Sequence, residues 1–362
     1  MWLKKKIIII DGSSLIQNRG TSAYVHSLIS GLSKINISSK ISIIVFVPLN
    51  CKLSFSLKNN IKIIKKPFVN KIIWDLLLLP LYCWFAGGSL LHYTENTGGS
   101  FLPRLMGIKV LLTIHDVSFL KPFRLVSNPS SLKQWIGLFY RKLCINNIAK
   151  NSTIIFTVSK FAKKDIVKEL RLPSKKIRVT NNCLSQKFLL PRTCLQEKKI
   201  LLVTGSSNQK NFNFTLQCLK NIKNILKGWK IIVVGIRGKN SQFIKYIGEI
   251  DRDDLIKYYD QSSIMIMPSL YESFSIPLIE GLSRGLLIIS SNKGAAPEII
   301  KNFGLLYNPK SCEELKTNLI HALNKNKFLK KSNKHKAKIY ASLYTDKKLA
   351  KVTYNNYSSI ID

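Results

Sequence analysis

The sequence predicts an α/β protein with two doubly wound, Rossmann-like domains, each built on a parallel sheet. Three observations lead to this prediction: a length of 362 residues, short apolar runs that alternate with longer helical patterns, and a pause in that alternation past the middle of the chain. The length suits two domains of roughly 150 to 200 residues each. Strands that alternate with helices are typical of a parallel sheet. We therefore expect two sheets facing each other across a cleft, and a C-terminal helix.

The first series of apolar runs lies in residues 1–185, the expected N-terminal domain. Each run is uniformly apolar, as in strands covered on both faces. The segment at 74–93 is interrupted by Pro80, Gly87 and Gly88 and falls short of about 20 clean apolar residues, so it predicts a buried or membrane-grazing helix and then a strand. The apolar run before Asp11 is likewise too short for a signal peptide. The expected strands are KKIIIID, ISIIVFV, IKIIKK, SLLHY, KVLLTI and STIIFTV.

The pattern pauses at 186–199, which we expect to be a linker, and resumes over 200–345, the expected C-terminal domain. The predicted strands there are ILLVTG, KIIVVG, SIMIMP and GLLIIS, and the predicted helices are NFNFTLQCLKNIKNIL, DRDDLIKYYDQ and PLIEGLSR. Residues 346–362 predict a helix that packs back toward the N-terminal domain. Open α/β sheets bind ligands beyond the carboxyl ends of their strands, so the cleft is the expected site.

The chain is strongly basic, with 57 Lys and Arg against 19 Asp and Glu and a net charge of +38. Such a surface attracts nucleic acid, anionic lipid or phosphorylated substrates, although a Lys-rich composition alone gives the same charge. No RNP-like motif, zinc-finger spacing or basic zipper is present, so we expect no specific nucleic-acid partner. Seven cysteines without a CxxC pair predict reduced thiols in a cytoplasmic protein. Because the chain is so basic, we also expect an anionic membrane surface as a partner. The protein would then lie peripherally on the inner face of the cytoplasmic membrane.

The segment YESFSIPLIEG places Glu272 on a loop and Glu280 about one turn inside a helix that starts near Pro277. The free amides and partial positive charge of a helix start suit a phosphate, and Ser275 is predicted to cap that start. Carboxylates can accept from neighbouring sugar hydroxyls. The alternative is a solvated loop acid at Glu272 and an ordinary first-turn acid at Glu280.

The block from 267 to 300 resembles the nucleotide-sugar site of the retaining glycosyltransferases of family 4, which have the GT-B fold. The mark of that family is two glutamates separated by seven residues before a helix, and Glu272 and Glu280 match them. The resemblance implies that Glu272 contacts the donor sugar and Glu280 the nucleotide ribose. Glu298, in a PE pair after the next strand, also matches and is implied at the donor.

The same block departs from the family at two serines. Ser273 and Ser275 stand where close relatives carry glycines around the aromatic residue, here Phe274. All three positions are implied to lie at the donor. Because serine resists a positive φ, we expect an altered cradle of amides there.

Two further segments resemble the family. LLVTGSSNQKNFNFTL implies Gly205 beside the donor and Lys210 at its diphosphate. TIHD implies that His115 touches the donor sugar, whereas Asp116 is an acceptor-side candidate; the alternatives are a structurally satisfied histidine and a capping aspartate.

The remaining polar motifs are weaker. In DGSSLIQNRGTSAYVHSL, Arg19 and Gly20 match the family segment near donor phosphate and acceptor. The paired aspartates of the DRDD run at 251–254 could be metal ligands. Acids at the start of a helix are expected to cap it, however, so no metal is predicted. Ser159 is predicted to be an N-cap.

Together these features predict a retaining, metal-independent glycosyltransferase that needs no cofactor and uses a nucleoside-diphosphate sugar as donor. Glu272, His115 and Lys210 are the expected catalytic residues. The acceptor is expected to be a glycan, free or linked to polyprenyl diphosphate, as in surface-polysaccharide, lipopolysaccharide or capsule assembly. Two alternatives stay open: a catalytically degenerate GT-B protein that binds a nucleotide sugar, and a basic nucleic-acid-binding protein.

Overall fold

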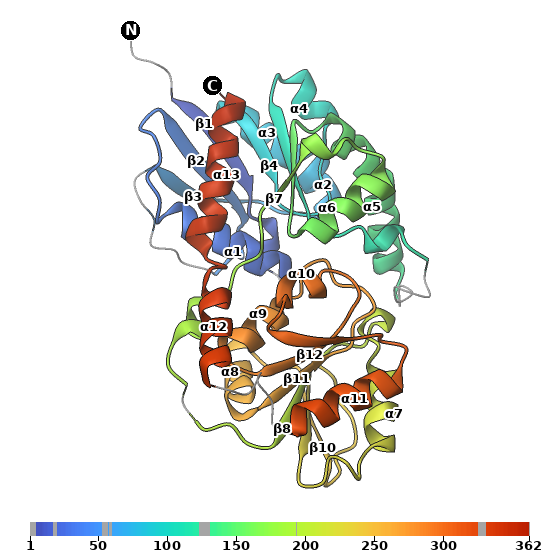
Figure 1. Ribbon diagram of the computed structural model, residues 1–362. Coiled ribbons are helices and arrows are strands. Elements are labelled where there is room, and N and C mark those ends of the chain that lie inside the picture. Colours follow the sequence, from blue (N-terminus) through green and yellow to red (C-terminus); the bar gives the residue numbers. More distant parts are fainter. Residues whose placement is uncertain are drawn as a thin grey trace. The chain divides into compact units, whose positions relative to one another are not determined.

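A computed structural model of the protein describes residues 5–16, 20–52, 57, 60–122, 131–192, 194–324 and 331–361 (Figure 1). The chain forms two compact units. Unit 1 comprises Met1–Leu120, Asn128–Cys183 and Thr345–Asp362, and unit 2 comprises Lys121–Ser127 and Leu184–Tyr344. Each unit is an α/β structure with its own parallel sheet.

The sheet of unit 1 has seven parallel strands in the order β3-β2-β1-β4-β5-β6-β7. β1 pairs with β2 on one side and β4 on the other, so the winding direction reverses between β1 and β4. In doubly wound sheets this switch point opens a crevice at the carboxyl ends of the strands. The strands are β1 Lys6–Asp11, β2 Ile41–Pro48, β3 Ile61–Lys66, β4 Gly88–Tyr93, β5 Lys109–Ile114, β6 Ile154–Thr157 and β7 Ile177–Val179.

Helices cover both faces of this sheet, because alternate strand residues point to opposite sides. Ile8 and Ile10 pack with α1 and α13, whereas Ile9 packs with α3, α5 and α6. The α-helices of the described part of unit 1 are α1 Gly20–Leu32, α2 Lys71–Ile73, α3 Leu79–Phe85, α4 Phe101–Leu105, α5 Leu132–Asn151, α6 Lys160–Leu170 and α13 Asp346–Ile361. A π-helical turn, η2 (Trp74–Leu78), joins α2 to α3, and short 3-10 helices are η1 Ser13–Ile16, η3 Ser118–Leu120 and η4 Ser174–Lys176.

The C-terminal helix α13 lies alongside α1 in unit 1 (Figure 1). Gly31 allows this approach, since a Cβ there would lie 2.1 Å from the carbonyl oxygen of Asp346. The hydroxyl of Tyr357 on α13 lies 2.6 Å from Nδ1 of His92 on β4. The last helix of the chain is therefore part of the unit 1 core.

The sheet of unit 2 has six parallel strands in the order β10-β9-β8-β11-β12-β13, with its switch point between β8 and β11. Ile264 and Ile266 of β11 face α7 and α11, and the intervening Met265 lies close to Gly281 of α9 on the other face. α12 packs on α9. The strands are β8 Lys199–Val203, β9 Lys230–Val234, β10 Ile244–Gly248, β11 Ile264–Met267, β12 Leu287–Ser291 and β13 Gly304–Tyr307. The helices are α7 Phe212–Asn221, α8 Arg252–Gln261, α9 Ile276–Ser283, α10 Ala296–Ile300, α11 Cys312–Leu323 and α12 Lys331–Ser342, with 3-10 helices η5 Gln186–Leu189 and η6 Asn208–Lys210.

The predicted fold class, two doubly wound parallel sheets, is confirmed by these topologies. Three strands were missing from the prediction: β7, β10 and β13. β7 has only three residues, and β10 carries a lysine and ends at a positive-φ glycine, so neither shows a uniform apolar run. β13 is four residues long with an exposed leucine. The helix expected from 211 to 226 is also shorter, since α7 ends at Asn221.

The cysteine prediction needs a correction. A disulfide joins Cys218 of α7 to Cys312 at the start of α11, with the two Cα atoms 5.4 Å apart, so not all seven thiols are free. The partners are separated by 94 residues, which leaves no spacing motif in the sequence. The other five cysteines are free.

Two capping predictions have different outcomes. Ser159 caps α6, because its hydroxyl accepts from the amide of Ala162 at 2.9 Å. Asp251 occupies the N-cap position of α8 but its side chain makes no capping hydrogen bond, and Asp253 instead binds Lys187 Nζ. Within the described ranges, no helix is both long enough and apolar enough to cross a bilayer.

Candidate active site

Two loops of unit 2 meet at its switch point, one following β8 and the other following β11. The amide of Leu270 donates to the carbonyl of Gln209 at 2.7 Å, which ties the second loop to η6. Lys210 Nζ, at the end of η6, lies 2.7 Å from Glu272 Oε1. The structure thus brings together two of the predicted catalytic residues at the edge where a doubly wound sheet binds its ligand.

The Lys210–Glu272 pair is only partly buried, with side-chain exposures of 25% and 15%. An ammonium has three donors and a carboxylate about four acceptor sites, so one mutual contact leaves both groups able to bind more. The pair can therefore hold a phosphate through Lys210 and a hydroxyl through Glu272. Gly205, on the same loop as Lys210, borders open space, because a Cβ there would meet no atom within 4 Å.

Gly294 fixes the backbone of Glu272. This glycine has a φ of +66°, and a Cβ on it would lie 2.7 Å from the amide nitrogen and the carbonyl oxygen of Glu272. The amide of Ala295 donates to that carbonyl at 2.9 Å. The loops after β11 and β12 therefore hold Glu272 from its main chain, so its position does not depend on its side-chain partner.

Ser275 precedes α9 in a left-handed conformation, with φ 69° and ψ 76°. Its side chain makes no capping hydrogen bond, and its buried Oγ has no hydrogen-bond partner among the described residues. This corrects the prediction that Ser275 caps the helix. A cap needs an extended backbone to turn its hydroxyl onto the free amides, and a left-handed residue turns it away. The backbone keeps a glycine-like conformation despite the serine.

Glu280 lies in the interior of unit 2, only 2% exposed. Its Oε2 accepts a hydrogen bond from the hydroxyl of Tyr259 on α8 at 2.9 Å. The two glutamates that were predicted to hold one donor thus have different partners, Lys210 for Glu272 and Tyr259 for Glu280. The aromatic partner was not predicted, because Tyr259 lies in DRDDLIKYYDQ and faces α9 only once α8 is folded.

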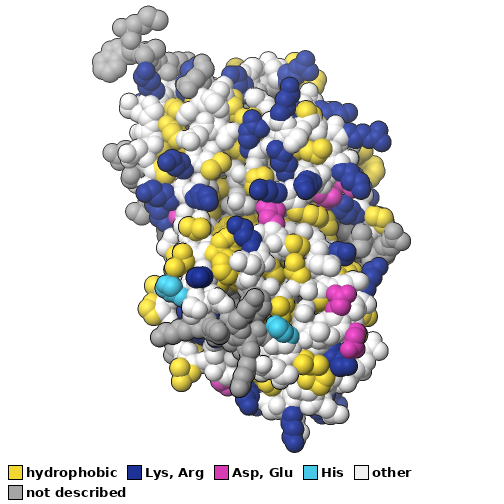
Figure 2. Space-filling model, in the orientation of Figure 1, with side chains coloured by type: hydrophobic (Ala, Val, Ile, Leu, Met, Phe, Trp, Pro, Cys, Tyr) yellow, Lys and Arg dark blue, Asp and Glu magenta, His cyan; other side chains and the backbone are white. Residues whose placement is uncertain are grey.

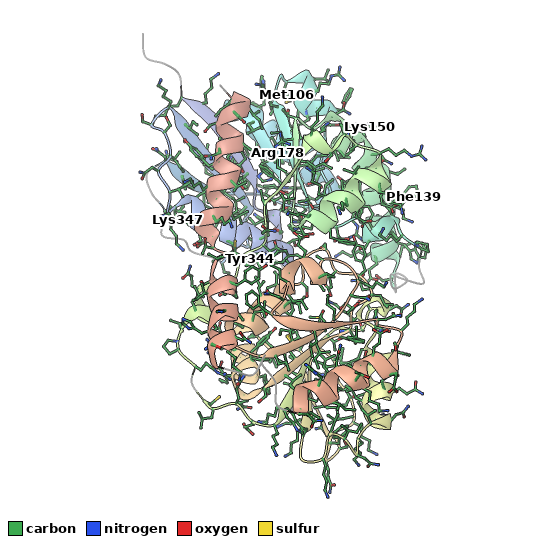
Figure 3. The ribbon with its side chains drawn as sticks, viewed as in Figure 1. Met106, Phe139, Lys150, Arg178, Tyr344 and Lys347 are labelled. Carbon is green, nitrogen blue, oxygen red and sulfur yellow. A yellow bond between two sulfur atoms is a disulfide. The ribbon has the colours of Figure 1, made fainter. Side chains whose placement is uncertain are left out.

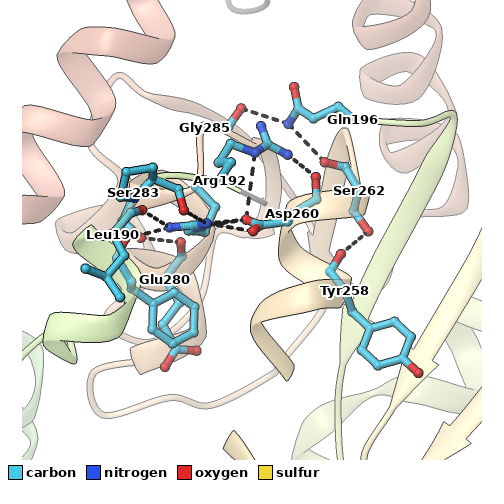
Figure 4. Close-up of polar contacts among 12 residues, drawn as sticks. Leu190, Arg192, Gln196, Tyr258, Asp260, Ser262, Glu280, Ser283 and Gly285 are labelled. Carbon is cyan, nitrogen blue, oxygen red and sulfur yellow. Dashed lines mark hydrogen bonds and ion pairs between the residues drawn. The ribbon is translucent and has the colours of Figure 1, made fainter. Parts of the chain in front are cut away.

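A buried ion pair anchors α9. Asp260, at the end of α8, receives hydrogen bonds from Nε and Nη2 of Arg284 at 2.6 and 2.7 Å. Nη1 of Arg284 also donates to the carbonyl of Leu190 at 2.6 Å. Figure 4 shows Asp260 between Arg192 and the end of α9, with Glu280 nearby. The pair therefore holds the segment before β8, α8 and the helix of Glu280 in one arrangement.

The other predicted donor residues lie in different surroundings. Phe274 is buried and packs edge-on against Tyr344 at 5.7 Å between centroids, so only its main chain is available to a ligand. Ser273 is half-buried. Glu298 is half-buried in the first turn of α10, and its charge helps burial raise the pKa of Tyr340.

In unit 1, His115 follows β5 and is buried against Tyr24, whose ring meets it edge-on at 4.9 Å. Burial lowers its pKa, and the carbonyl of Thr94, 2.9 Å from Nε2, opposes that shift. A carbonyl only accepts, so the proton of the neutral ring is on Nε2 and Nδ1 carries a lone pair. His115 is therefore suited to accept a hydrogen bond from a hydroxyl and not to donate a proton.

The acceptor-side candidates are less closely tied to a site. Oδ1 of Asp116 accepts from the amide of Ser118 at 2.9 Å, so this carboxylate forms the turn into η3, as the capping alternative had it. Gly20 opens α1 and borders open space. Arg19 lies outside the described residues.

A buried cluster at the switch point of unit 1 was missed. Lys71 Nζ lies 2.9 Å from Asp11 Oδ2, 2.8 Å from Glu95 Oε2 and 3.0 Å from Asp75 Oδ1. The contact with Asp75 is an ion pair without hydrogen-bond geometry. Burial raises the pKa of Asp75 to about 7, although Lys71 opposes the shift. The signals in the sequence were acids at two strand ends, Asp11 in IIIIDG and Glu95 in HYTEN. In the part of the chain that the structure describes, no group of three or more His, Cys, Asp or Glu is arranged to hold a metal ion.

Comparisons with known proteins agree with this geometry. Residues 193–340 match the family model described as glycosyl transferases group 1. This segment, less than half of the chain, is similar to the group 1 glycosyltransferases. It is 22% identical over 212 residues to the O-antigen chain mannosyltransferase B of Escherichia coli, covering 51% of this chain and 55% of that protein. It is 24% identical to the O-antigen chain mannosyltransferase RfbU of Salmonella typhimurium, covering 67% of each. The chain thus spans about half to two thirds of the length of these relatives.

Solved structures with the GT-B fold match the chain over nearly its whole length, which shows that it has this fold. The sucrose-phosphate synthase of Thermosynechococcus elongatus matches with a TM-score of 0.69 at 15% identity, covering 99% of both chains. Anabaena Alr3699/HepE in complex with UDP-glucose matches with a TM-score of 0.70 at 13% identity, covering 98% of this chain and 99% of that one. The family segment contains Lys210, Glu272, Glu280 and Glu298, whereas His115 lies in unit 1, outside it.

Proposed function

We propose that this protein transfers a sugar from a nucleoside-diphosphate sugar to a glycan, with retention of the anomeric configuration and without a metal. The observation that carries the proposal is the Lys210–Glu272 pair at the switch point of the family segment. Such a pair combines a cation for a diphosphate with an acceptor for sugar hydroxyls, which is the minimum that a nucleotide-sugar site requires.

In the proposed reaction the bond between the anomeric carbon and the diphosphate oxygen breaks, and the acceptor oxygen bonds to the same face of that carbon. The diphosphate takes the acceptor proton, so no protein base is needed. Lys210 and the amides at the start of α9 stabilise the negative charge that develops on the leaving diphosphate, where preorganised donors act most strongly. Glu272 orients the donor sugar through its hydroxyls. His115 accepts from a sugar hydroxyl through Nδ1.

The comparisons guide the choice of substrates. One structural neighbour is described in complex with UDP-glucose, and two relatives are O-antigen chain mannosyltransferases. We therefore propose a hexose donor and an acceptor of the surface-polysaccharide class, free or carried on polyprenyl diphosphate. An acceptor of the second kind implies that the protein works in the cytoplasm against the inner face of the membrane.

The test is the release of nucleoside diphosphate from a panel of UDP-, GDP- and ADP-hexoses, with simple hexosides as acceptors. We expect turnover with one donor, the same anomer in product and donor, and no loss of activity in EDTA. Glu272→Gln should lower kcat/KM by about 100-fold or more, since it removes an interaction at the reacting sugar. Glu313→Gln, an exposed acid on α11 of the same unit, is the matched control and should change nothing.

Two results would favour the rivals. A donor that raises the melting temperature but is never turned over would indicate a degenerate GT-B protein that binds nucleotide sugar. Duplex or single-strand binding with a steep log–log salt dependence, and no response to any nucleotide sugar, would indicate a nucleic-acid-binding protein.

A further inference from the structure

The longest helix of unit 1, α5, has an exposed apolar stripe in addition to its buried one. Leu132, Ile136, Phe139 and Leu143 repeat every three to four residues and are all more than half exposed. This spacing places them on one side of the helix. Figure 3 shows Phe139 on the outside of α5. Leu138, Ile145 and Ile148 form the other stripe and pack in the unit 1 core. The exposed stripe is therefore extra to what the fold requires.

The apolar surface continues onto two neighbouring elements. Tyr140 of α5 donates to Asp75 Oδ2 at 3.2 Å, which places η2 against α5. Ser100, at the start of α4, donates to Asn147 of α5 at 2.7 Å. α4 also contacts η2. Exposed large apolar residues lie on both: Leu76 and Leu77 on η2, and Phe101 and Leu105 on α4.

These three elements form one surface, which we call the apolar face of unit 1 and define by η2, α4 and α5. Eight exposed leucine, isoleucine and phenylalanine side chains expose on the order of several hundred Å² of apolar area, which is as large as the patches that soluble monomers usually show at functional sites. Trp135, also on α5, is 47% exposed. An exposed tryptophan beside leucine and phenylalanine is typical of surfaces that enter a membrane interface.

The exposed charges on the three elements of the apolar face have one sign, because Asp75 of η2 is fully buried. α4 and α5 contain no Asp or Glu, and they carry Arg104, Lys133, Arg141, Lys142 and Lys150. Figure 3 shows Lys150 on α5, and in Figure 2 Lys and Arg side chains greatly outnumber Asp and Glu on the part of the visible face that belongs to unit 1. Basic side chains near an anionic bilayer contribute about 1 kcal/mol each. The charge argues against a second copy of the chain as occupant, because two such faces repel each other.

We propose that the apolar face of unit 1 binds an anionic lipid bilayer, with the α5 stripe inserted among the headgroups and the basic residues beside it at the lipid phosphates. Interfacial helices of this kind sit roughly 5 to 10 Å into the headgroup region without crossing the bilayer. The inference deepens the proposed function, on which it rests for its purpose, because it names the element that would hold the enzyme at the surface carrying its acceptor.

The experiment measures flotation of the full chain with phosphatidylcholine vesicles, with and without phosphatidylglycerol. We expect binding to the anionic vesicles and little to phosphatidylcholine alone. Ile136→Glu, at 51% exposure on α5, should weaken the partition coefficient by about ten-fold, since a charge replaces an inserted side chain. Ile339→Glu, at 52% exposure on α12 of unit 2, makes the same change of residue and net charge and should weaken binding less than two-fold.

Further readouts keep the result interpretable. Tryptophan emission should shift to the blue on anionic vesicles, and Trp135→Phe should remove most of that shift. Equal losses in the two Ile→Glu variants, with both folded by circular dichroism, would overturn the inference, as would no vesicle binding at all. A dimer in solution that Ile136→Glu dissociates would assign the apolar face to a second copy instead. Donor turnover with a soluble acceptor is measured on the same samples, so failure of the proposed function is seen separately.

Discussion

Lys210 Nζ lies 2.7 Å from Glu272 Oε1, and the two side chains come from the loops after β8 and β11 on the two sides of the unit 2 switch point. The Glu272 carboxylate is paired with the ammonium group of Lys210, which we assign to the diphosphate. A bound diphosphate would therefore compete with Glu272 for Lys210. The two residues should therefore affect nucleotide binding in opposite directions. Binding of the nucleoside diphosphate that gives the largest thermal shift is the measurement.

Lys210→Met should weaken that nucleoside diphosphate about 10- to 100-fold and leave its parent nucleoside unaffected, because only the phosphates meet the ammonium. Glu272→Gln should leave the diphosphate as tight as in the wild type or tighter, since Lys210 is released. Lys220→Met, on the exposed side of α7, is the control. A Lys210→Met variant that weakens nucleoside and diphosphate equally would contradict the assignment.

Ser275 predicts a stabilising substitution. A non-glycine residue at φ 69° carries a steric cost of roughly 1 to 2 kcal/mol, and the buried Oγ adds an unsatisfied polar atom. Ser275→Gly should therefore raise stability by about 1 kcal/mol, which corresponds to roughly 2 to 4 °C in Tm for a unit of this size. Thermal unfolding followed by circular dichroism measures it.

Ser273→Gly is the matched control, two residues away and without a positive φ. Glycine there only increases the freedom of the unfolded chain, so it should destabilise by about 0.5 to 1 kcal/mol. A Tm that falls in both variants would mean that the left-handed conformation at Ser275 is not strained.

Asp75 predicts an unusual pH dependence of stability. Burial raises its pKa to about 7, with Lys71 opposing and the charge of Asp11 adding to the rise, whereas an unfolded aspartate titrates near 3.8. Between these values the folded chain binds more protons than the unfolded chain, so stability falls as the pH rises from about 4 to 7. The contribution is at most about 1.4 kcal/mol per pH unit.

Asp75→Asn should remove this component, because the amide stays neutral, keeps an oxygen beside Lys71 and can donate to the hydroxyl of Tyr140. The variant should match the wild type near pH 4 and exceed its stability at pH 8, as measured by urea unfolding at each pH. Parallel stability profiles for the two proteins would show that Asp75 titrates in its ordinary range.

The sequence was sufficient for the fold because the signal of a parallel sheet is local: uniform apolar runs such as IIII and IIVFV mark strands covered on both faces. It failed where a strand is short or half-exposed, as in β7, β10 and β13. The position of Lys210 and Glu272 could also be predicted, since both lie in segments that follow the end of a predicted strand. Partners fixed by tertiary packing could not. Tyr259 contacts Glu280, Lys71 contacts Asp11, and Cys218 is bonded to Cys312. The partners in each pair are far apart in the sequence, so no local pattern predicts the contact. The left-handed φ of Ser275 is a further example, because the residue type argues against it.

The buried pair between Asp260 and Arg284 predicts a large loss of stability from a single change. Both side chains are almost fully buried, and Arg284 satisfies its remaining donors on the carbonyls of Phe188 and Leu190. Asp260→Asn leaves the guanidinium buried without a counter-charge, which typically costs about 3 to 5 kcal/mol. Urea unfolding should show this loss, and α9 should lose amide-exchange protection with it. Asp254→Asn removes the exposed pair with Lys257 on the same helix and should leave the urea midpoint nearly unchanged, because water and salt screen such a pair. The double change Asp260→Leu with Arg284→Met removes both charges and should recover much of the lost stability. If the double variant is instead as unstable as Asp260→Asn, the carbonyl contacts of Arg284, and not its charge, hold the helix.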